Sequence, residues 1–154
     1  MASRVPNIAK GRVVHLATLP LANDAIVAVP LKTAGLPTDE QMCDAASLAA
    51  IFALGASENA TMGRKTLTGV AVTVDNTANE ARVTSNNPVW TAAQMAPAGG
   101  AVSRLAYCYV PDTTAPSDAT AVPLVILDAN VTPDSNAYEY QHGAAGWFGA
   151  TEPA

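Results

Sequence analysis

The feature that most constrains this chain is a series of short segments in which apolar and polar residues alternate. Residues 65–74, 80–84 and 102–110 all follow this period of two. Because successive side chains of a β-strand point to opposite faces, the period indicates strands that bury one face. The whole pattern predicts a mainly β protein, either an antiparallel β-sandwich or a small β-barrel. Shorter apolar or β-branched segments, which we also predict to be strands, lie at 12–17, 25–31, 122–128, 137–141 and 146–150.

One segment departs from the β pattern and predicts an inserted α-helix at about 38–54. Thr38 and Gln41 have the spacing of a capping box, and Gly55 is a typical residue for the end of a helix. The opposite sides of the segment are both apolar, so we expect the helix to be buried on more than one side. One of the two apolar faces carries Met42, Ala45, Ala46, Ala49 and Phe52.

Two local predictions concern how the strands pair. Residues 65–74 and 80–84 are expected to form one hairpin around a turn at 75–79. The threonine- and valine-rich face of this hairpin is suited to a core or to a neighbouring molecule. Pro30 has no backbone N–H, so it places the strand at 25–31 at the edge of a sheet or ends it.

The 154 residues are enough for one domain with a hydrophobic core. We assign residues 12–154 to a single β-rich domain that the helix interrupts. We assign residues 1–11 to an N-terminal arm that is extended, or that orders only on binding, because this segment has few apolar residues.

The chain is poor in charge. Charged residues make up 14% of it, against roughly 25% in a typical soluble domain, which suggests that an assembly covers part of the surface. The formal net charge is −5, and the 8 lysines and arginines are scattered. Because nucleic-acid binding requires clustered positive charge, we expect no nucleic-acid partner.

Neither the cysteines nor the apolar runs indicate a secreted or membrane protein. Cys43 and Cys108 are too few for a zinc site, and we favour two buried free thiols over a disulfide. Residues 1–12 lack the apolar core of a signal peptide. The longest apolar run, residues 45–56, is far shorter than the ~20 residues that span a membrane. We therefore expect a protein made in a cytoplasm, without a membrane partner.

The motifs that suggest nucleotide or metal binding lack residues that such sites require. The segment GRKT at 63–66 looks like the end of a phosphate-binding loop, but Asn59 and Arg64 stand where that loop requires glycines. We interpret its basic pair as exposed. His15, which we expect in the core or an interface, and His142, in a turn, have no metal ligands at the usual spacing. We therefore predict no catalytic residues, no metal site and no cofactor.

The acidic residues fit structural roles better than acid–base catalysis, because they stand where helix caps and turns are expected. These residues are Asp39, Glu40, Asp112, Asp118, Asp128 and Asp134.

The few aromatic residues are the candidates for binding other proteins, because aromatic side chains are enriched at interface hot spots. We interpret them as anchors of the core or of a subunit interface. A platform for a small ligand is the less favoured interpretation. The candidate interface residues are Trp90, Tyr107, Tyr109, Trp147 and Phe148.

The stretch SENATMGRKTLTGVAVTVDNTANEARV, at 57–83, carries a longer pattern. An asparagine beside an acidic residue precedes Arg-Lys, a threonine-rich strand ending in Val-Asp, a turn, a second strand and then a tryptophan. Residues 105–140 and the ending GWFGAT continue it. From about residue 36 onward, the chain resembles small structural proteins of tailed bacteriophages, some of which are head-decoration (cement) proteins. The matching residues include Asn59, Arg64, Lys65, Thr66, Val74, Asp75, Arg82, Val83, Trp90, Tyr109, Pro111, Asp112, Asp118, Pro123, Asp128 and Pro133.

The resemblance implies assembly and not catalysis. It implies a homo-oligomer, which we expect to be a homotrimer, that binds the major capsid protein on the outer capsid surface and stabilises capsomer junctions. The protein would be made in the host cytoplasm and end in the virion.

Three alternatives stay open. The first is a phage tail or baseplate component. The second is a carbohydrate-binding module that uses Tyr107, Tyr109, Trp147 and Phe148. The third is an enzyme with polar residues converging around His15, His142 or Cys43.

Overall fold

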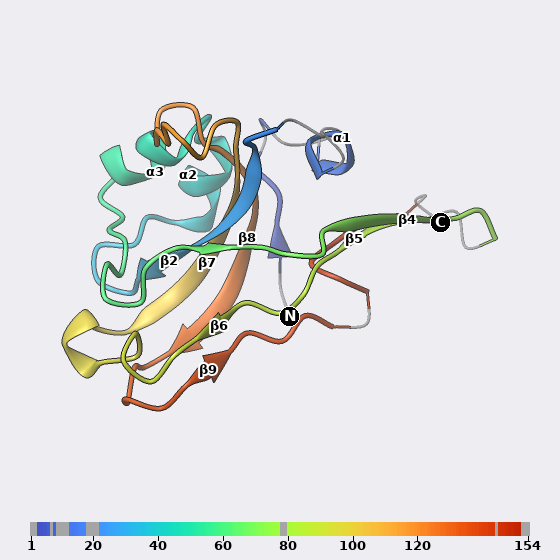
Figure 1. Ribbon diagram of the computed structural model, residues 1–154. Helices are drawn as coiled ribbons and strands as arrows, with labels where there is room; N and C mark the ends of the chain where they lie inside the picture. The colour runs from blue at the N-terminus through green and yellow to red at the C-terminus, as the bar shows by residue number, and fades with distance from the viewer. Residues whose placement is uncertain are drawn as a thin grey trace.

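The computed structural model confirms a mainly β, antiparallel fold (Figure 1). The structure describes residues 3–6, 8, 13–17, 22–77, 80–143 and 145–151. Its largest sheet has the strand order β1-β8-β7-β2-β3. These strands are β1 (Ser3–Arg4), β2 (Ala25–Lys32), β3 (Lys65–Thr66), β7 (Val102–Val110) and β8 (Val122–Val131).

Two smaller sheets and several short helices complete the fold. One sheet has the order β10-β5-β4, and the other pairs β6 with β9. Their strands are β4 (Ala71–Asp75), β5 (Glu80–Thr84), β6 (Val89–Trp90), β9 (Tyr138–Glu139) and β10 (Phe148–Thr151). The helices are α1 (Val13–Ala17), α2 (Asp39–Asp44), α3 (Leu48–Ala53) and the 3-10 helix η2 (Pro97–Gly99).

The largest sheet is buried on both faces, as β7 shows. Leu105 and Tyr107 point into a cluster that contains buried residues of β5 and β6. Ala106 and Cys108 point the other way, into a cluster with the buried residues of α2 and α3. Because side chains alternate along a strand, β7 contributes to two cores at once. The alternation predicted for residues 102–110 is therefore confirmed from Leu105 onward, but Val102 lies in the cluster of Leu105, beyond a register irregularity between Val102 and Arg104.

The single helix predicted at 38–54 is wrong, because the segment forms two short helices. The capping box that begins α2 is confirmed, with Gln41 N donating to Thr38 Oγ1. Ala45 then takes an extended conformation (φ −69°, ψ 129°) and ends α2. Ser47 begins α3 by accepting a hydrogen bond from Ala50 N at 3.2 Å.

A distant loop causes this break. Leu48 N donates to Ala121 O and Ala49 N donates to Asp118 O, both at 2.9 Å. These N–H groups would bond within the helix if it were continuous. The break also changes the buried face: Leu48 and Ile51 are buried, whereas Ala46 is exposed.

The strand predicted at 12–17 is also wrong, since residues 13–17 form the helix α1. Val13 is buried in the same cluster as Val83 of β5, and α1 lies against β4 and β5. A short apolar run does not distinguish a strand from a buried helical turn, which explains the error.

The hairpin predicted from 65–74 and 80–84 is confirmed in its outer half. β4 pairs with β5 from Ala71↔Thr84 to Asp75↔Glu80. The first half differs, because β3 pairs with β2 in the largest sheet. The chain changes sheets between β3 and β4, where Gly69 adopts a positive φ of 62°.

Pro30 lies neither at a sheet edge nor at a strand end. It is in the middle of β2, opposite Leu105 of β7. On the other side of β2, β3 pairs only with Val27 and Ala28. Pro30 O accepts a hydrogen bond from Asn59 N there, at 2.8 Å. This bond belongs to an isolated antiparallel bridge, Leu31↔Glu58, that continues the pairing of β2. The missing N–H of Pro30 lies on the same side, where Asn59 O accepts from Gly63 N instead, so the Asn59 carbonyl is not left without a donor.

The strand β1 brings part of the predicted N-terminal arm into the largest sheet. Ser3 and Arg4 pair antiparallel with β8. Arg4 contacts Asp39 at 2.6 Å and Asp128 at 3.0 Å, and Arg104 contacts the same two carboxylates. The rest of that arm, at 1–2, 7 and 9–11, lies outside the described residues.

Asn59 is the one polar side chain that is buried among the described residues. Its Nδ2 donates to Gly100 O at 2.9 Å, and its Oδ1 accepts from Thr61 N at 3.1 Å and Met62 N at 3.0 Å. A Cβ on Gly99 would lie 2.5 Å from this Oδ1, so only glycine fits beside it. The residue therefore joins two loops and, through its backbone N–H, the strand β2.

The loop held by Asn59 is also tied to β6. Trp90 Nε1 donates to Gly63 O at 3.0 Å, and Gln94 Nε2 donates to Met62 O at 3.0 Å. Lys65 Nζ in turn donates to Gln94 Oε1 at 2.7 Å. These side chains hold the start of β3 in place.

We predict that Asn59→Ala lowers the free energy of unfolding by about 3 kcal/mol, because it removes three hydrogen bonds to the backbone and leaves the buried Met62 N–H without a partner. Urea unfolding followed by tryptophan fluorescence measures this change. Asn76→Ala, in the exposed loop after β4, is the control and should change stability by less than about 0.5 kcal/mol. Equal stabilities of the two variants would contradict the role of Asn59.

Candidate interaction surface

The most distinctive surface belongs to the small sheet of β4, β5 and β10, which we call the arm. Figure 1 shows the β4–β5 hairpin extending away from the body, on the side opposite α2 and α3. The strands of the arm pair antiparallel throughout. The arm therefore presents two sheet faces and two edges outside the compact part of the molecule.

One face of the arm is entirely apolar. The pairing places Val72 beside Val83 and Phe148, and Val74 beside Ala81 and Ala150. Because paired residues in adjacent strands point to the same side, these six side chains share one face. The opposite face carries Thr73, Asp75, Glu80, Arg82 and Thr84.

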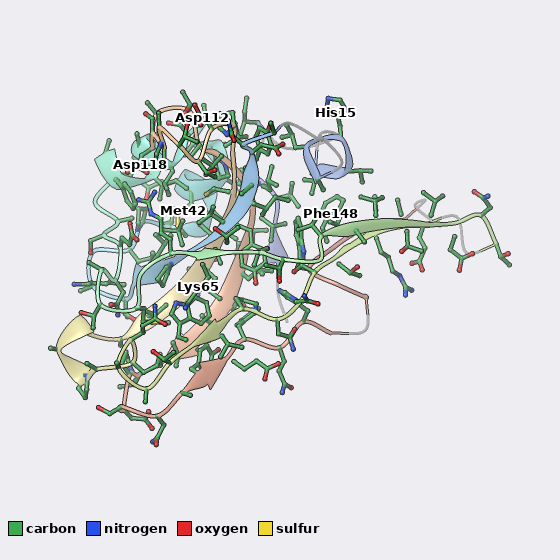
Figure 2. The ribbon with its side chains drawn as sticks, viewed as in Figure 1. His15, Met42, Lys65, Asp112, Asp118 and Phe148 are labelled. Atoms are coloured by element: carbon green, nitrogen blue, oxygen red, sulfur yellow. The ribbon has the colours of Figure 1, made fainter. Side chains whose placement is uncertain are left out.

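The apolar face is covered at its base and open at its tip. Val83 is fully buried, and Phe148 lies partly buried where the arm leaves the body (Figure 2). Val74, near the tip, is 63% exposed, and Ala150 beside it is also exposed. The tip therefore offers an apolar surface to another molecule, as the valine-rich pattern of the sequence suggested.

The aromatic residues predicted as interface candidates lie elsewhere. Trp90, Tyr107, Tyr109 and Trp147 are buried inside the chain, with at most 5% exposure. Phe148 alone among the five has a partly exposed side chain. The first four are therefore core residues of the folded chain, which is one of the two roles, core or subunit interface, that the sequence left open for them.

Tyr107 and Tyr140 pack against His142, and Trp147 packs against Tyr107. Tyr107 Oη and His142 Nε2 lie 2.7 Å apart, and the rings of Tyr107 and Trp147 meet edge to face at 5.5 Å. Tyr140 also packs edge to face on the histidine, at 5.8 Å. His142 Nδ1 and Trp147 Nε1 are buried and meet no hydrogen-bond partner among the described residues.

Burial controls the protonation of this cluster. Burial lowers the pKa of His142, because the charged imidazolium would lose the hydration that stabilises it in water. It raises the pKa of Tyr140 to about 12 and that of Tyr107 further, with smaller contributions from neighbouring tyrosines. The histidine is therefore held neutral between the body and the arm.

The basic pair in the segment GRKT is not exposed, contrary to the prediction. Arg64 donates through Nε and Nη2 to Glu58 Oε2, at 2.9 and 2.7 Å, and through Nη1 to Asp118 Oδ1 at 2.7 Å. These carboxylates raise the pKa of Arg64, with the Glu58 hydrogen bond as the largest cause. Lys65 is held by Gln94. The pair fastens the start of β3 to the loop at 111–121.

His15 and the cysteines also differ in part from expectation. His15 is exposed on α1 and does not lie in a core strand. Both cysteines are free thiols, as favoured, but only Cys108 is buried, whereas Cys43 is partly exposed. Burial raises the pKa of Cys108 to about 12, so its thiol stays protonated at neutral pH.

Most of the acidic residues lie at the helix caps and turns that the sequence predicts, but Asp128 lies within β8 and forms ion pairs. Asp112 accepts from Thr114 N and Asp134 accepts from Asn136 N, at 2.8 and 3.0 Å, as turn residues do. Hydrogen bonds from the side chains of Thr114 and Asn136, and then these backbone bonds, lower the pKa of the Asp112 and Asp134 carboxyls. Asp39 lies in the first turn of α2, and Asp128 completes the ion pairs with Arg4.

The described residues line a cavity and an open groove, and their lining residues lie outside the arm. One of about 230 Å³ lies between α1 and β2, lined by Leu16, Ile26 and Tyr109. The other, of about 410 Å³, is an open apolar groove between α2 and α3, lined by Ala46 and Ala50. No group of three potential metal ligands occurs among the described residues. None of the helices in that same part of the chain is long and apolar enough to cross a membrane.

No family model, no curated protein and no solved structure matches this chain. The resemblance to phage structural proteins therefore rests on the sequence motifs described above.

We predict that stability falls as the pH drops below about 6.5, the ordinary pKa of histidine. Because the pKa of His142 is lowered in the folded chain, the unfolded chain binds a proton first, and acid favours unfolding down to the folded pKa. Urea midpoints at about pH 8 and about pH 5 measure the loss.

In His142→Gln, the difference between the urea midpoints at these two pH values should be smaller than in the wild type. His15→Gln, on the exposed face of α1, is the matched control and should keep it. An unchanged pH dependence in His142→Gln would show that another group causes the loss.

Proposed function

We propose that this protein is a bacteriophage head-decoration (cement) protein, which binds the outer surface of the major capsid shell and stabilises the junctions between capsomers. The phage assignment comes from the sequence resemblance. The structural observation that carries the assembly role is the apolar tip of the arm, with Val74 63% exposed.

The geometry of the arm supports a binding role. Scattered exposed apolar residues are ordinary, but here they share one flat sheet face that the body leaves uncovered. The body below is held by side-chain contacts between its sheets and loops, such as those of Asn59 and Arg64. A rigid body with a projecting sheet suits a protein that bridges neighbouring subunits.

The proposal includes self-association and excludes catalysis as the main role. The protein acts as a homo-oligomer, and a homotrimer matches the three-fold positions that a capsid offers. It is located on the capsid surface of the virion after synthesis in the host cytoplasm. Its partners are the major capsid protein and its own copies, with no cofactor, nucleic acid or membrane.

A tail or baseplate role is the second candidate, and the arm suits it equally well as an assembly surface. A carbohydrate-binding module is disfavoured, because Tyr107, Tyr109 and Trp147 are buried and offer no stacking surface.

We predict that the purified protein cosediments with undecorated phage particles and reaches a copy number near that of the capsomer junctions. Particles that already carry it should take up no more, which is the control. The purified protein should show no hydrolase activity. A low copy number, about six or twelve per particle, would replace decoration with a tail or portal role, because those assemblies have that symmetry.

A further inference from the structure

We propose that the free edge of β4 pairs antiparallel with β4 of a second copy, around a two-fold axis at Thr73. This inference specifies a contact for the self-association in the proposed function and rests on that part of it alone. It does not depend on the phage assignment.

The edge of β4 is the first step of the argument. β4 is the outermost strand of the arm among the described residues, with β5 on its other side. Every second residue of such a strand directs its N–H and C=O outward, where they bond to water or to another strand. The partner that satisfies these groups in register is itself an extended strand.

The other edges of the molecule show how this chain protects a strand from pairing. The largest sheet ends in β1 and β3, which are two residues long and carry Arg4 and Lys65. Short edges and cations are common protection against strand pairing. β4 is five residues long, and Ala71–Val74 hold no charge, proline or glycine. β10, on the far edge of the arm, contains Gly149, which weakens a strand.

The order of residues in β4 suits a second copy of itself. A two-fold axis at Thr73 places Thr73 opposite Thr73, Val72 opposite Val74 and Ala71 opposite Asp75. The valines of both copies then lie on one side, so the two apolar faces of the arms join. A shift by one residue would place valines on the polar side, which the face pattern disfavours. The two copies of Asp75 stay apart, each opposite an alanine.

The position of the arm leaves room for this contact. The outer half of the β4–β5 hairpin extends past α1, clear of the body (Figure 1). Figure 2 shows the side chains of this part standing out from both faces of the ribbon. The contact is isologous, so it joins copies in pairs. In a shell of trimers, it would link neighbouring trimers and not the subunits within one.

The experiment uses charge substitutions at the two-fold axis. In Thr73→Lys and in Thr73→Glu, two like charges meet directly across the strands, so each variant alone should self-associate about tenfold more weakly than the wild type. An equimolar mixture of the two variants should form Lys–Glu heterodimers with about the affinity of the wild-type self-association. Sedimentation velocity over a concentration series measures the dissociation constants, and circular dichroism confirms folding.

The matched controls are Thr77→Lys and Thr77→Glu, in the exposed hairpin loop. They should associate as the wild type does, alone or mixed. A thiol cross-linker that spans much less than about 26 Å gives a second measurement of the contact, in chains that also carry Cys43→Ala. It should join two chains that carry Thr73→Cys but not two that carry Thr77→Cys, because the latter positions would lie about 26 Å apart.

Three results would overturn the pairing. These are a wild-type chain that stays monomeric at every concentration, self-association that is insensitive to charge at residue 73, and equal cross-linking at residues 73 and 77. Particle binding without any Thr73→Cys cross-link would reject the pairing and keep the proposed function. Cross-linking without particle binding would support the pairing and reject the proposed function.

Discussion

The rest of the structure depends on the hydrogen bonds of the Asn59 side chain. This side chain is fully buried and bonds to Gly100 O and to two backbone N–H groups of its own loop. Its own N–H reaches Pro30 in the middle of β2. The loop fixed in this way presents Gly63 O to Trp90 and leads directly into β3. One amide therefore sets where β3 begins, and with it the point at which the chain leaves the largest sheet for the arm.

The arm differs from the body in how its apolar residues are used. In the body, β7 supplies two cores because both faces of its sheet are covered. In the arm, α1 and the body cover the base near Val83, while the face continues outward to Val74 without cover. Burying an exposed apolar side chain is favourable by about 1.5–3 kcal/mol when a partner covers it. The apolar side chains of the body gain this free energy when the chain folds, whereas those at the tip of the arm would gain it only when a partner covers them.

Local signals in the sequence predicted local structure well. The alternation in β7 from Leu105 onward, the β4–β5 pairing and the capping box at Thr38 depend on neighbours in the chain, and the structure has all three. The break between α2 and α3 depends on a loop about seventy residues away, and no local signal marks it. The sequence left the aromatic residues open between core and interface, because composition cannot distinguish the two, and the structure buries four of the five in the core. The valine pattern did point to the arm, but not to the uncovered position of Val74.

Most of the residues named for the phage resemblance lie in the body, although Val74, Asp75, Arg82 and Val83 belong to the arm. Asn59, Arg64 and Trp90 bond to the chain itself and hold its loops in place. The exposed part of β4 contributes mainly its strand edge and small apolar side chains, which many sequences could supply. A related chain could keep every internal contact and still bind another partner through its arm. The resemblance is therefore evidence about the scaffold first, and the identity of the partner has to be established on the arm.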